Sequence, residues 1–394
     1  MPQVRAALFW LLAASLVVLE GFALAGYGPP ATLSILSVYA LFGFASLAAQ
    51  RAIRPGPSGA GLRPAETASL LILGAFALGA VAAGTVDLRT GARAGLLTAG
   101  LVGLGWYLRD AMRASGDGRR AALVELRDAS IVPLAVMQVP FFLWATTGLD
   151  PVFDARVLAI EGRLGVELTA LAHRAFDAVP LADVASLACY FGLPVGLAVA
   201  AHVQPTGDRR SRVLAAIVAC GIVGFTLYAV SPVVGLFPAY PEGAPPAASV
   251  EGVPLTVAAE VPRNGMPSLH TAWALLIAMN AAALRGAWRP ALVTFAGLNV
   301  WAATGAVGHW ALDILVAVPL ATSVQAAVVL SSGPRRPMAT AGAAACVTLV
   351  VAWTAGIRLN LLAGLPGPAA WLAVVATIGL PAAAGLALSA SGRR

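Results

Sequence analysis

The sequence has little charge and contains no lysine. Charged residues make up 11% of its 394 residues, whereas apolar residues make up 59% and the mean hydropathy is +0.84. A soluble domain usually has roughly 25% charged residues. All 25 basic residues are arginines, placed singly or in small groups between apolar runs. Despite the net charge of +7, this pattern does not suggest nucleic-acid binding, and it predicts that lipid surrounds most of the chain.

Cysteine is also scarce. The three cysteines, Cys189, Cys220 and Cys346, all lie within apolar runs. They lack the spacing of a zinc site or of a disulfide-rich scaffold, so we expect buried thiols. The sequence predicts no bound metal and no cofactor.

Apolar runs long enough to cross about 30 Å of hydrocarbon as helices occur along the whole chain. They predict an all-α, polytopic membrane helix bundle with about 12 transmembrane helices. The expected spans are residues 6–26, 30–49, 67–86, 92–108, 129–149, 180–202, 212–232, 267–284, 290–306, 309–331, 340–358 and 366–390. The first run also resembles a signal peptide, since Arg5 precedes it and Ala23-Leu24-Ala25 is similar to a cleavage site.

The arginines are divided unevenly between alternate loops. Eighteen fall in loops on the side of the N-terminus and seven in the opposite loops. The seven are Arg89, Arg93, Arg156, Arg163, Arg174, Arg263 and Arg358. Because arginine-rich loops stay in the cytoplasm, both termini of this cell-membrane protein are predicted to be cytoplasmic.

We expect three parts along the chain. Residues 1–128 would form a four-span N-terminal unit, residues 129–331 a six-span catalytic core, and residues 332–394 a two-span C-terminal unit. Within the core, apolar residues at helical spacing in 150–179 predict an amphipathic helix lying in the membrane interface. Residues 233–266 are rich in Pro, Gly and Ala and predict an irregular extracytoplasmic loop.

The first candidate motif lies before the expected span at 267–284. From Asn264 to His270 the chain has the sequence Asn-Gly-Met-Pro-Ser-Leu-His, which predicts a turn followed by a helix N-terminus. Such an end would place Ser268, His270 and free backbone N–H groups around an anion such as phosphate. The chain has four histidines, and we expect His173 and His202 to be packed core residues.

The second candidate motif, Gly-His-Trp-Ala-Leu-Asp, runs from Gly308 to Asp313. His309 and Asp313 are four residues apart and would share one helix face, so the carboxylate can accept from one imidazole nitrogen and leave the other nucleophilic. Ionisable residues at membrane depth usually have a function. We therefore expect His309 to be the nucleophile, Asp313 to orient it, and His270 to act as general acid and base. A metal site is chemically possible here, but the pattern does not demand one.

These residues resemble the type 2 phosphatidic acid phosphatase superfamily, whose second motif is Pro-Ser-Gly-His and whose third ends in His with Asp four residues later. They are more similar to the branch of inositol phosphorylceramide synthase, the aureobasidin-resistance-like inositolphosphotransferases. The segment Gly265 to His270 matches that branch's Gly-Met-Pro-Ser-Leu-His, and Gly305 to Asp313 is similar to its Gly-x-His-Tyr-x-x-Asp. Tyr228 to Gly235 is similar to its Tyr-x-x-x-Pro-x-x-Gly, and the resemblance covers about residues 150–330.

The chain also departs from the superfamily's pattern. The first motif, a lysine followed by Arg-Pro, cannot exist without lysine, and Ala303 stands where an arginine is expected six residues before His309. We expect Arg263, just before the second motif, to replace a lost cation, with Arg156 or Arg163 as alternatives. Together with Ser268 and Gly265, Arg263 forms the expected phosphate-binding set.

The resemblance implies a six-helix catalytic core that acts on a phospholipid or lipid-linked phosphate, and the arginine distribution predicts that this site is at the extracytoplasmic face. The first hypothesis is a lipid phosphotransferase that moves a phosphoryl-linked head group, such as inositol phosphate, to a hydroxyl acceptor through a phosphohistidine. The second is a lipid phosphate or pyrophosphate phosphatase. A third, from another class, is a non-catalytic lipid transporter or flippase. The sequence predicts no oligomeric state.

Overall fold

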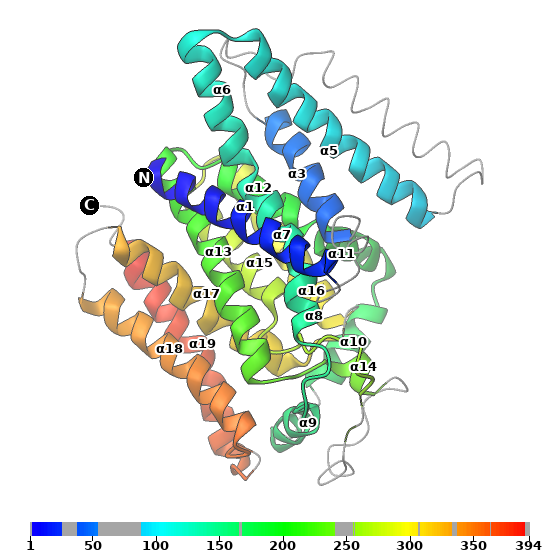
Figure 1. Ribbon diagram of the computed structural model, residues 1–394. Helices are drawn as coiled ribbons and strands as arrows, with labels where there is room; N and C mark the ends of the chain where they lie inside the picture. The colour runs from blue at the N-terminus through cyan, green and yellow to red at the C-terminus, as the bar shows by residue number, and fades with distance from the viewer. Residues whose placement is uncertain are drawn as a thin grey trace. The chain divides into compact units, whose positions relative to one another are not determined.

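The part of the chain that the structure describes is mainly helical (Figure 1). This computed structural model describes residues 2–25, 38–53, 88–164, 168–240, 255, 257–305, 308–332, 337–362 and 364–390. These ranges contain helices and no strand, which confirms the expected all-α membrane helix bundle.

The chain forms two compact units. One comprises Met1–Phe141 and Phe191–Ala215, and the other comprises Phe142–Tyr190 and Ala216–Arg394. The division of the chain at residues 128 and 331, expected from sequence, stays a prediction.

The first unit consists of short and long helices with polar contacts between some of them. Its helices are α1 (Pro2–Leu24), α3 (Val38–Ile53), α5 (Leu88–Arg113), α6 (Gly116–Ala129), α7 (Ile131–Met137) and α12 (Leu193–His202). Arg5 of α1 lies 2.5 Å from the buried carboxylate of Asp128, and the Gln138 amide donates to the Leu12 carbonyl at 3.1 Å.

The second unit is built around α17, which packs against α15, α18 and α19 (Figure 1). Its helices are α9 (Asp154–Arg163), α10 (Leu168–Asp177), α11 (Pro180–Phe191), α14 (Leu236–Ala239), α15 (Leu269–Ala281), α16 (Trp288–Gly305), α17 (Ala311–Ser331), α18 (Pro337–Arg358) and α19 (Gly367–Ala390). Two further helices, α8 (Val139–Ala145) and α13 (Gly207–Val230), each begin in the first unit and end in the second.

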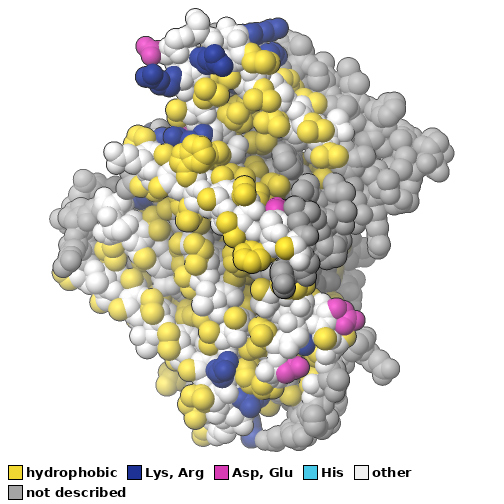
Figure 2. Space-filling view, in the orientation of Figure 1, with side chains coloured by type: hydrophobic (Ala, Val, Ile, Leu, Met, Phe, Trp, Pro, Cys, Tyr) yellow, Lys and Arg dark blue, Asp and Glu magenta, His cyan; other side chains and the backbone are white. Residues whose placement is uncertain are grey.

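Several helices have the length and composition of membrane spans. In the described residues six pass this test, or seven if Ala185–Phe191 and Leu193–His202 form one broken span. The six are Pro2–Ala23, Gly116–Ala145, Gly207–Val230, Ala311–Ser331, Pro337–Arg358 and Gly367–Gly385. This is consistent with a multi-pass membrane protein, and Figure 2 shows apolar side chains spread over the visible face with few charged ones.

The expected count of about 12 spans is not confirmed. One expected span, residues 67–86, lies outside the described residues. Others correspond to helices shorter than the roughly 20 residues that cross a bilayer. Helix α15 has 13 residues and α3 has 16.

Residues 150–179 differ from the single interface helix expected from sequence. They form two helices, α9 and α10, and residues 165–167 between them lie outside the described residues. The buried side of α9 carries Asp154 and Glu161 beside Val157 and Ile160. The sequence did not predict carboxylates on this buried side, and the placement of the segment in the membrane interface stays a prediction.

Helices α3 and α5 approach so closely that position 103 has room only for glycine. A Cβ atom at Gly103 would lie 2.5 Å from the backbone nitrogen of Ala48, whereas one at Gly105 would meet nothing within 4 Å. We predict that Gly103→Ala lowers the thermal unfolding midpoint in detergent, because the two helices must separate. The matched control Gly105→Ala should leave the midpoint unchanged or raise it, since alanine favours helix by up to about 1 kcal/mol. Equal midpoints for the two variants would contradict this packing.

Candidate active site

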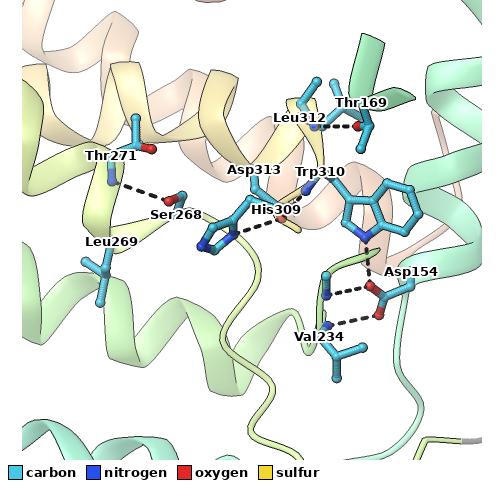
Figure 3. A network of polar contacts seen from close by, with 12 residues as sticks. Asp154, Thr169, Val234, Ser268, Leu269, Thr271, His309, Trp310, Leu312 and Asp313 are labelled. Carbon is cyan, nitrogen blue, oxygen red and sulfur yellow. Dashed lines mark hydrogen bonds and ion pairs between the residues drawn. The ribbon is translucent and has the colours of Figure 1, made fainter. Parts of the chain in front are cut away.

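His309 lies two residues before α17 and Asp313 in its first turn, so they meet at the helix start and not on the shared helix face expected from sequence. The Nδ1 atom of His309 lies 3.3 Å from Asp313 Oδ2, and the two side chains are 8% and 0% exposed. The same carboxylate oxygen accepts the backbone N–H of Trp310 at 2.9 Å (Figure 3). Because Nδ1 faces the carboxylate, Nε2 is the nitrogen of His309 left for attack on a substrate.

The second motif is joined directly to this helix start. The backbone N–H of Ser268 donates to the Asp313 carbonyl oxygen at 3.0 Å. His270 lies in the first turn of α15, and its ring stacks on Tyr190 with centroids 3.9 Å apart and an interplanar angle of 9°. The imidazoles of His270 and His309 are close enough to interact electrostatically. The structure thus brings together the residues for which we predict a catalytic role.

The start of α15 is not the open anion site that the sequence suggested. Its N–H groups are already bonded within the protein: Ser268 to the carbonyl of Asp313, Leu269 to the Tyr228 hydroxyl at 3.2 Å, and Thr271 to Ser268 Oγ at 3.3 Å. The expectation of free backbone donors is wrong for these three groups. Ser268 caps the helix, and its contact with phosphate stays a prediction.

Arg263 is fully buried, and its guanidinium is engaged by the surrounding loops. Its bonds run to the backbone carbonyls of Leu149, Ala258, Ala259 and Val261, and one nitrogen lies 3.7 Å from Asp150. Among the alternatives, Arg156 donates to the Ile357 and Arg358 carbonyls at the end of α18. These contacts show Arg263 fastening the loop before the second motif, and its role toward phosphate stays a prediction.

Gly265 allows two backbone segments to meet. Its N–H donates to the Val233 carbonyl at 2.6 Å, and a Cβ atom at position 265 would lie 2.7 Å from Val233 Cγ1. A comparable approach joins Gly308, with φ +77, to the neighbouring segment, where Leu236 donates to the Gly308 carbonyl at 2.5 Å. Segment 232–236 therefore contacts both histidine motifs. The contacts of Gly265 are with Val233, and its role in binding phosphate stays a prediction.

Asp154 is an important residue that sequence reasoning missed. Its Oδ1 accepts the indole N–H of Trp310 at 2.8 Å and the backbone N–H of Gly235 at 2.9 Å, and its Oδ2 accepts from Val234 at 3.0 Å (Figure 3). Both Asp154 and Trp310 are fully buried. The indole of Trp310 thus lies in the core next to His309.

Glu161, seven positions after Asp154 on α9, binds the first residues of α17 that follow Trp310. Its Oε1 accepts the backbone N–H of Leu312 at 3.2 Å, and its Oε2 accepts from the Thr169 hydroxyl at 2.7 Å. Thr169 in turn accepts the N–H of Ala311 at 2.9 Å. The first N–H groups of a helix have no partner within the helix, and here side chains of α9 and α10 supply those partners.

Burial controls the titration of both α9 carboxyls. Removal from water raises the pKa of Asp154 from 3.8 to about 7, against the opposing effect of the bonds from Trp310, Val234 and Gly235. Burial likewise raises the pKa of Glu161 from 4.5 to about 7, against the bonds from Thr169 and Leu312. The sequence did contain a signal that could have identified Asp154 and Glu161 as important. They are two acids spaced by two helical turns, and hence on one helix face, in a chain with few acidic residues.

Comparison with known proteins gives one match. Residues 155–327 match the family model described as the PAP2 superfamily, which is less than half of the chain. The matched stretch contains His270, His309 and Asp313, and the match supports phosphatase or phosphotransferase activity in general terms. It does not confirm the inositol phosphorylceramide synthase branch. Searches of curated proteins and of solved structures found no match.

The described residues contain no group of three or more His, Cys, Asp or Glu side chains arranged to hold a metal ion. The side chains gathered around His309 are instead arranged to hydrogen-bond one another and the start of α17.

The raised pKa of Glu161 predicts a pH effect on stability. Between about pH 4.5 and 7 the folded protein binds more protons at this residue than the unfolded chain, so the contribution of Glu161 to stability falls as pH rises through this window. Glu161→Gln cannot titrate and keeps an acceptor for Leu312. We expect the thermal midpoint of the unmodified protein minus that of the variant to decrease from pH 4.5 to 7 and then level off. A difference that stays constant or grows would contradict the assignment.

Proposed function

We propose that this protein is a membrane lipid phosphotransferase that moves a phosphoryl-linked head group, such as inositol phosphate, from a lipid donor to a hydroxyl acceptor. The observation that carries the proposal is the direct joining of the two histidine motifs. Ser268 donates to the Asp313 carbonyl while the Asp313 carboxylate faces His309. One residue thus positions both the start of α15 and the candidate nucleophile.

In the first step, Nε2 of His309 attacks phosphorus, an N–P bond forms, and the bond from phosphorus to the diacylglycerol oxygen breaks. His270 protonates that leaving oxygen. Asp313 accepts a hydrogen bond from Nδ1–H of His309 and stabilises the positive charge that the ring gains as it becomes phosphorylated.

In the second step, neutral His270 removes the proton from the acceptor hydroxyl. The acceptor oxygen attacks phosphorus, and the N–P bond breaks to regenerate His309. A lipid or glycan hydroxyl as acceptor completes transfer, whereas water would complete hydrolysis. We propose that the hydroxyl of Ser268 donates to a phosphate oxygen, and that Arg263 acts by fixing the loop that carries Gly265.

The charges around His309 favour a phosphodiester donor. The buried carboxylate of Asp313 faces His309, while the contacts of Arg263 lie on loop carbonyls and Asp150. Negative groups repel a doubly charged phosphate monoester more than a singly charged phosphodiester. This difference supports head-group transfer over phosphatase activity on a monoester.

The reaction is proposed to occur at the extracytoplasmic face. The support for this orientation is the arginine distribution, which predicts cytoplasmic termini and places both histidine motifs on the opposite side.

Purified protein in nanodiscs would test the activity. The nanodiscs would contain phosphatidylinositol radiolabelled on its phosphate together with an acceptor lipid that has a free hydroxyl. A labelled new lipid is the expected product. Labelled water-soluble phosphate or inositol phosphate without new lipid would overturn transfer in favour of hydrolysis. Unchanged label would oppose both reactions and favour a transporter.

The nucleophile is tested by substitution. His309→Gln should lower the rate of product formation by roughly 10³-fold or more, because it removes the attacking nitrogen. It should also abolish an acid-labile, alkali-stable phosphorylated protein. The matched control is His202→Gln on α12, which should retain activity within about twofold. Full activity in His309→Gln would show that another group is the nucleophile.

A further inference from the structure

Two buried carboxylates of α9 have no part in the proposed chemical steps. Asp154 is fully buried and Glu161 is 2% exposed. Their hydrogen-bond partners are N–H and O–H groups, and within the described ranges neither forms a salt bridge. Burying a carboxylate without a cation is costly, so a core shaped for stability alone would favour apolar side chains at these positions.

Asp154 reaches His309 through Trp310. The indole N–H of Trp310 donates to Asp154, and its backbone N–H donates to Asp313 Oδ2, the oxygen that faces His309 Nδ1. Trp310 is therefore fixed at both ends. A shift of its indole would move a donor that sets the position of the Asp313 carboxylate.

Glu161 fixes the following residues of the same turn. Leu312 donates to Glu161 directly, and Ala311 donates to Thr169, whose hydroxyl donates to Glu161. The backbone N–H groups of three consecutive residues, 310 to 312, thus all end on side chains. Negative groups at a helix N-terminus are also favoured by the helix dipole.

We propose that Asp154 and Glu161 are positioning residues that hold the turn from His309 to Asp313 in the geometry needed for attack by His309 Nε2. This role rests on the proposed function of His309 as nucleophile. Neither carboxylate touches the reacting atoms. They act through Trp310 and through the first backbone groups of α17, and a displacement of about 1 Å at a reacting group can cost roughly 10²-fold in rate.

The first test is a double-mutant cycle with the nanodisc assay. Asp154→Asn turns an amide NH₂ toward N–H donors, and Trp310→Phe removes the indole N–H. Each should lower kcat by about 10- to 100-fold with KM within about twofold. The double variant should be no slower than the slower single one, because both changes break the same bond. Additive losses, or a loss confined to KM, would overturn the positioning role.

Trp353→Phe is the matched control. It removes another buried indole N–H bond, from Trp353 to the Thr377 hydroxyl at 2.7 Å, between α18 and α19. Its kcat should stay within about twofold of the unmodified protein. A fall equal to that of Trp310→Phe would attribute the effect to general core damage and overturn the proposal. If Asp154→Asn does not fold, Glu161→Gln and Trp310→Phe carry the test, with a fall in kcat of at least about threefold expected for Glu161→Gln.

A second readout does not depend on activity. Protein labelled with ¹⁵N in its histidine rings has four imidazoles, and His309→Gln identifies the signal of His309. In Asp154→Asn this signal should move toward that of a free imidazole as the contact with Asp313 loosens, whereas Trp353→Phe should leave it in place. A shifted signal in a protein that transfers no phosphate would support the positioning role of Asp154 and oppose the proposed function. An unshifted signal and an unchanged kcat in Asp154→Asn would overturn the positioning role and would not affect the proposed function.

Discussion

The carboxylate of Asp154 is the point at which three segments of the second unit meet. It accepts from Val234 and Gly235 of one segment and from Trp310 of another, and it belongs to α9 itself. The segment that contains Val234 also accepts from Gly265 and donates to Gly308. Loss of this carboxylate would leave three buried N–H donors without a partner, each costing about 1–3 kcal/mol. Asp154 therefore supports the relative placement of both histidine motifs, in addition to the direct bond from Ser268 to the Asp313 carbonyl.

This arrangement accounts for polar groups in such an apolar chain. Apolar helices pack in lipid without a hydrophobic force to set their register, so buried hydrogen bonds contribute to that register. Here the bonds gather at one end of α17 and α15, where irregular backbone would otherwise leave N–H groups unpaired. Farther along, Asn280 of α15 and Gln325 of α17 form a reciprocal amide pair with distances of 3.1 and 3.3 Å. The same two helices are thus fixed at two points.

Local patterns predicted local features well. The spacing of His309 and Asp313 predicted their contact, and the serine before an apolar run predicted the helix start at Ser268. Hydropathy could not predict the span count, because a buried helix such as α15 is apolar without being long. Helical periodicity could not predict that the buried face of α9 carries carboxylates, since a helix with an entirely apolar buried face has the same period. Nor could proximity in sequence predict that the Arg263 guanidinium points into its own loop.

The charges around His309, together with the absence of the superfamily's lysine and arginine, bear on which phosphate substrate the site would accept. In the proposed mechanism the phosphorylated imidazole keeps its Nδ1 proton and is positively charged, so the carboxylate of Asp313 stabilises it relative to neutral histidine. The same negative charge disfavours a phosphate that brings two negative charges, unless a cation is present. The superfamily's lysine and arginine clamps are absent from this sequence, and Ala303 is fully buried where one arginine is expected. Such a site would stabilise the proposed covalent intermediate and would bind a dianion poorly. These properties suit a phosphodiester, because its phosphate group carries a single negative charge.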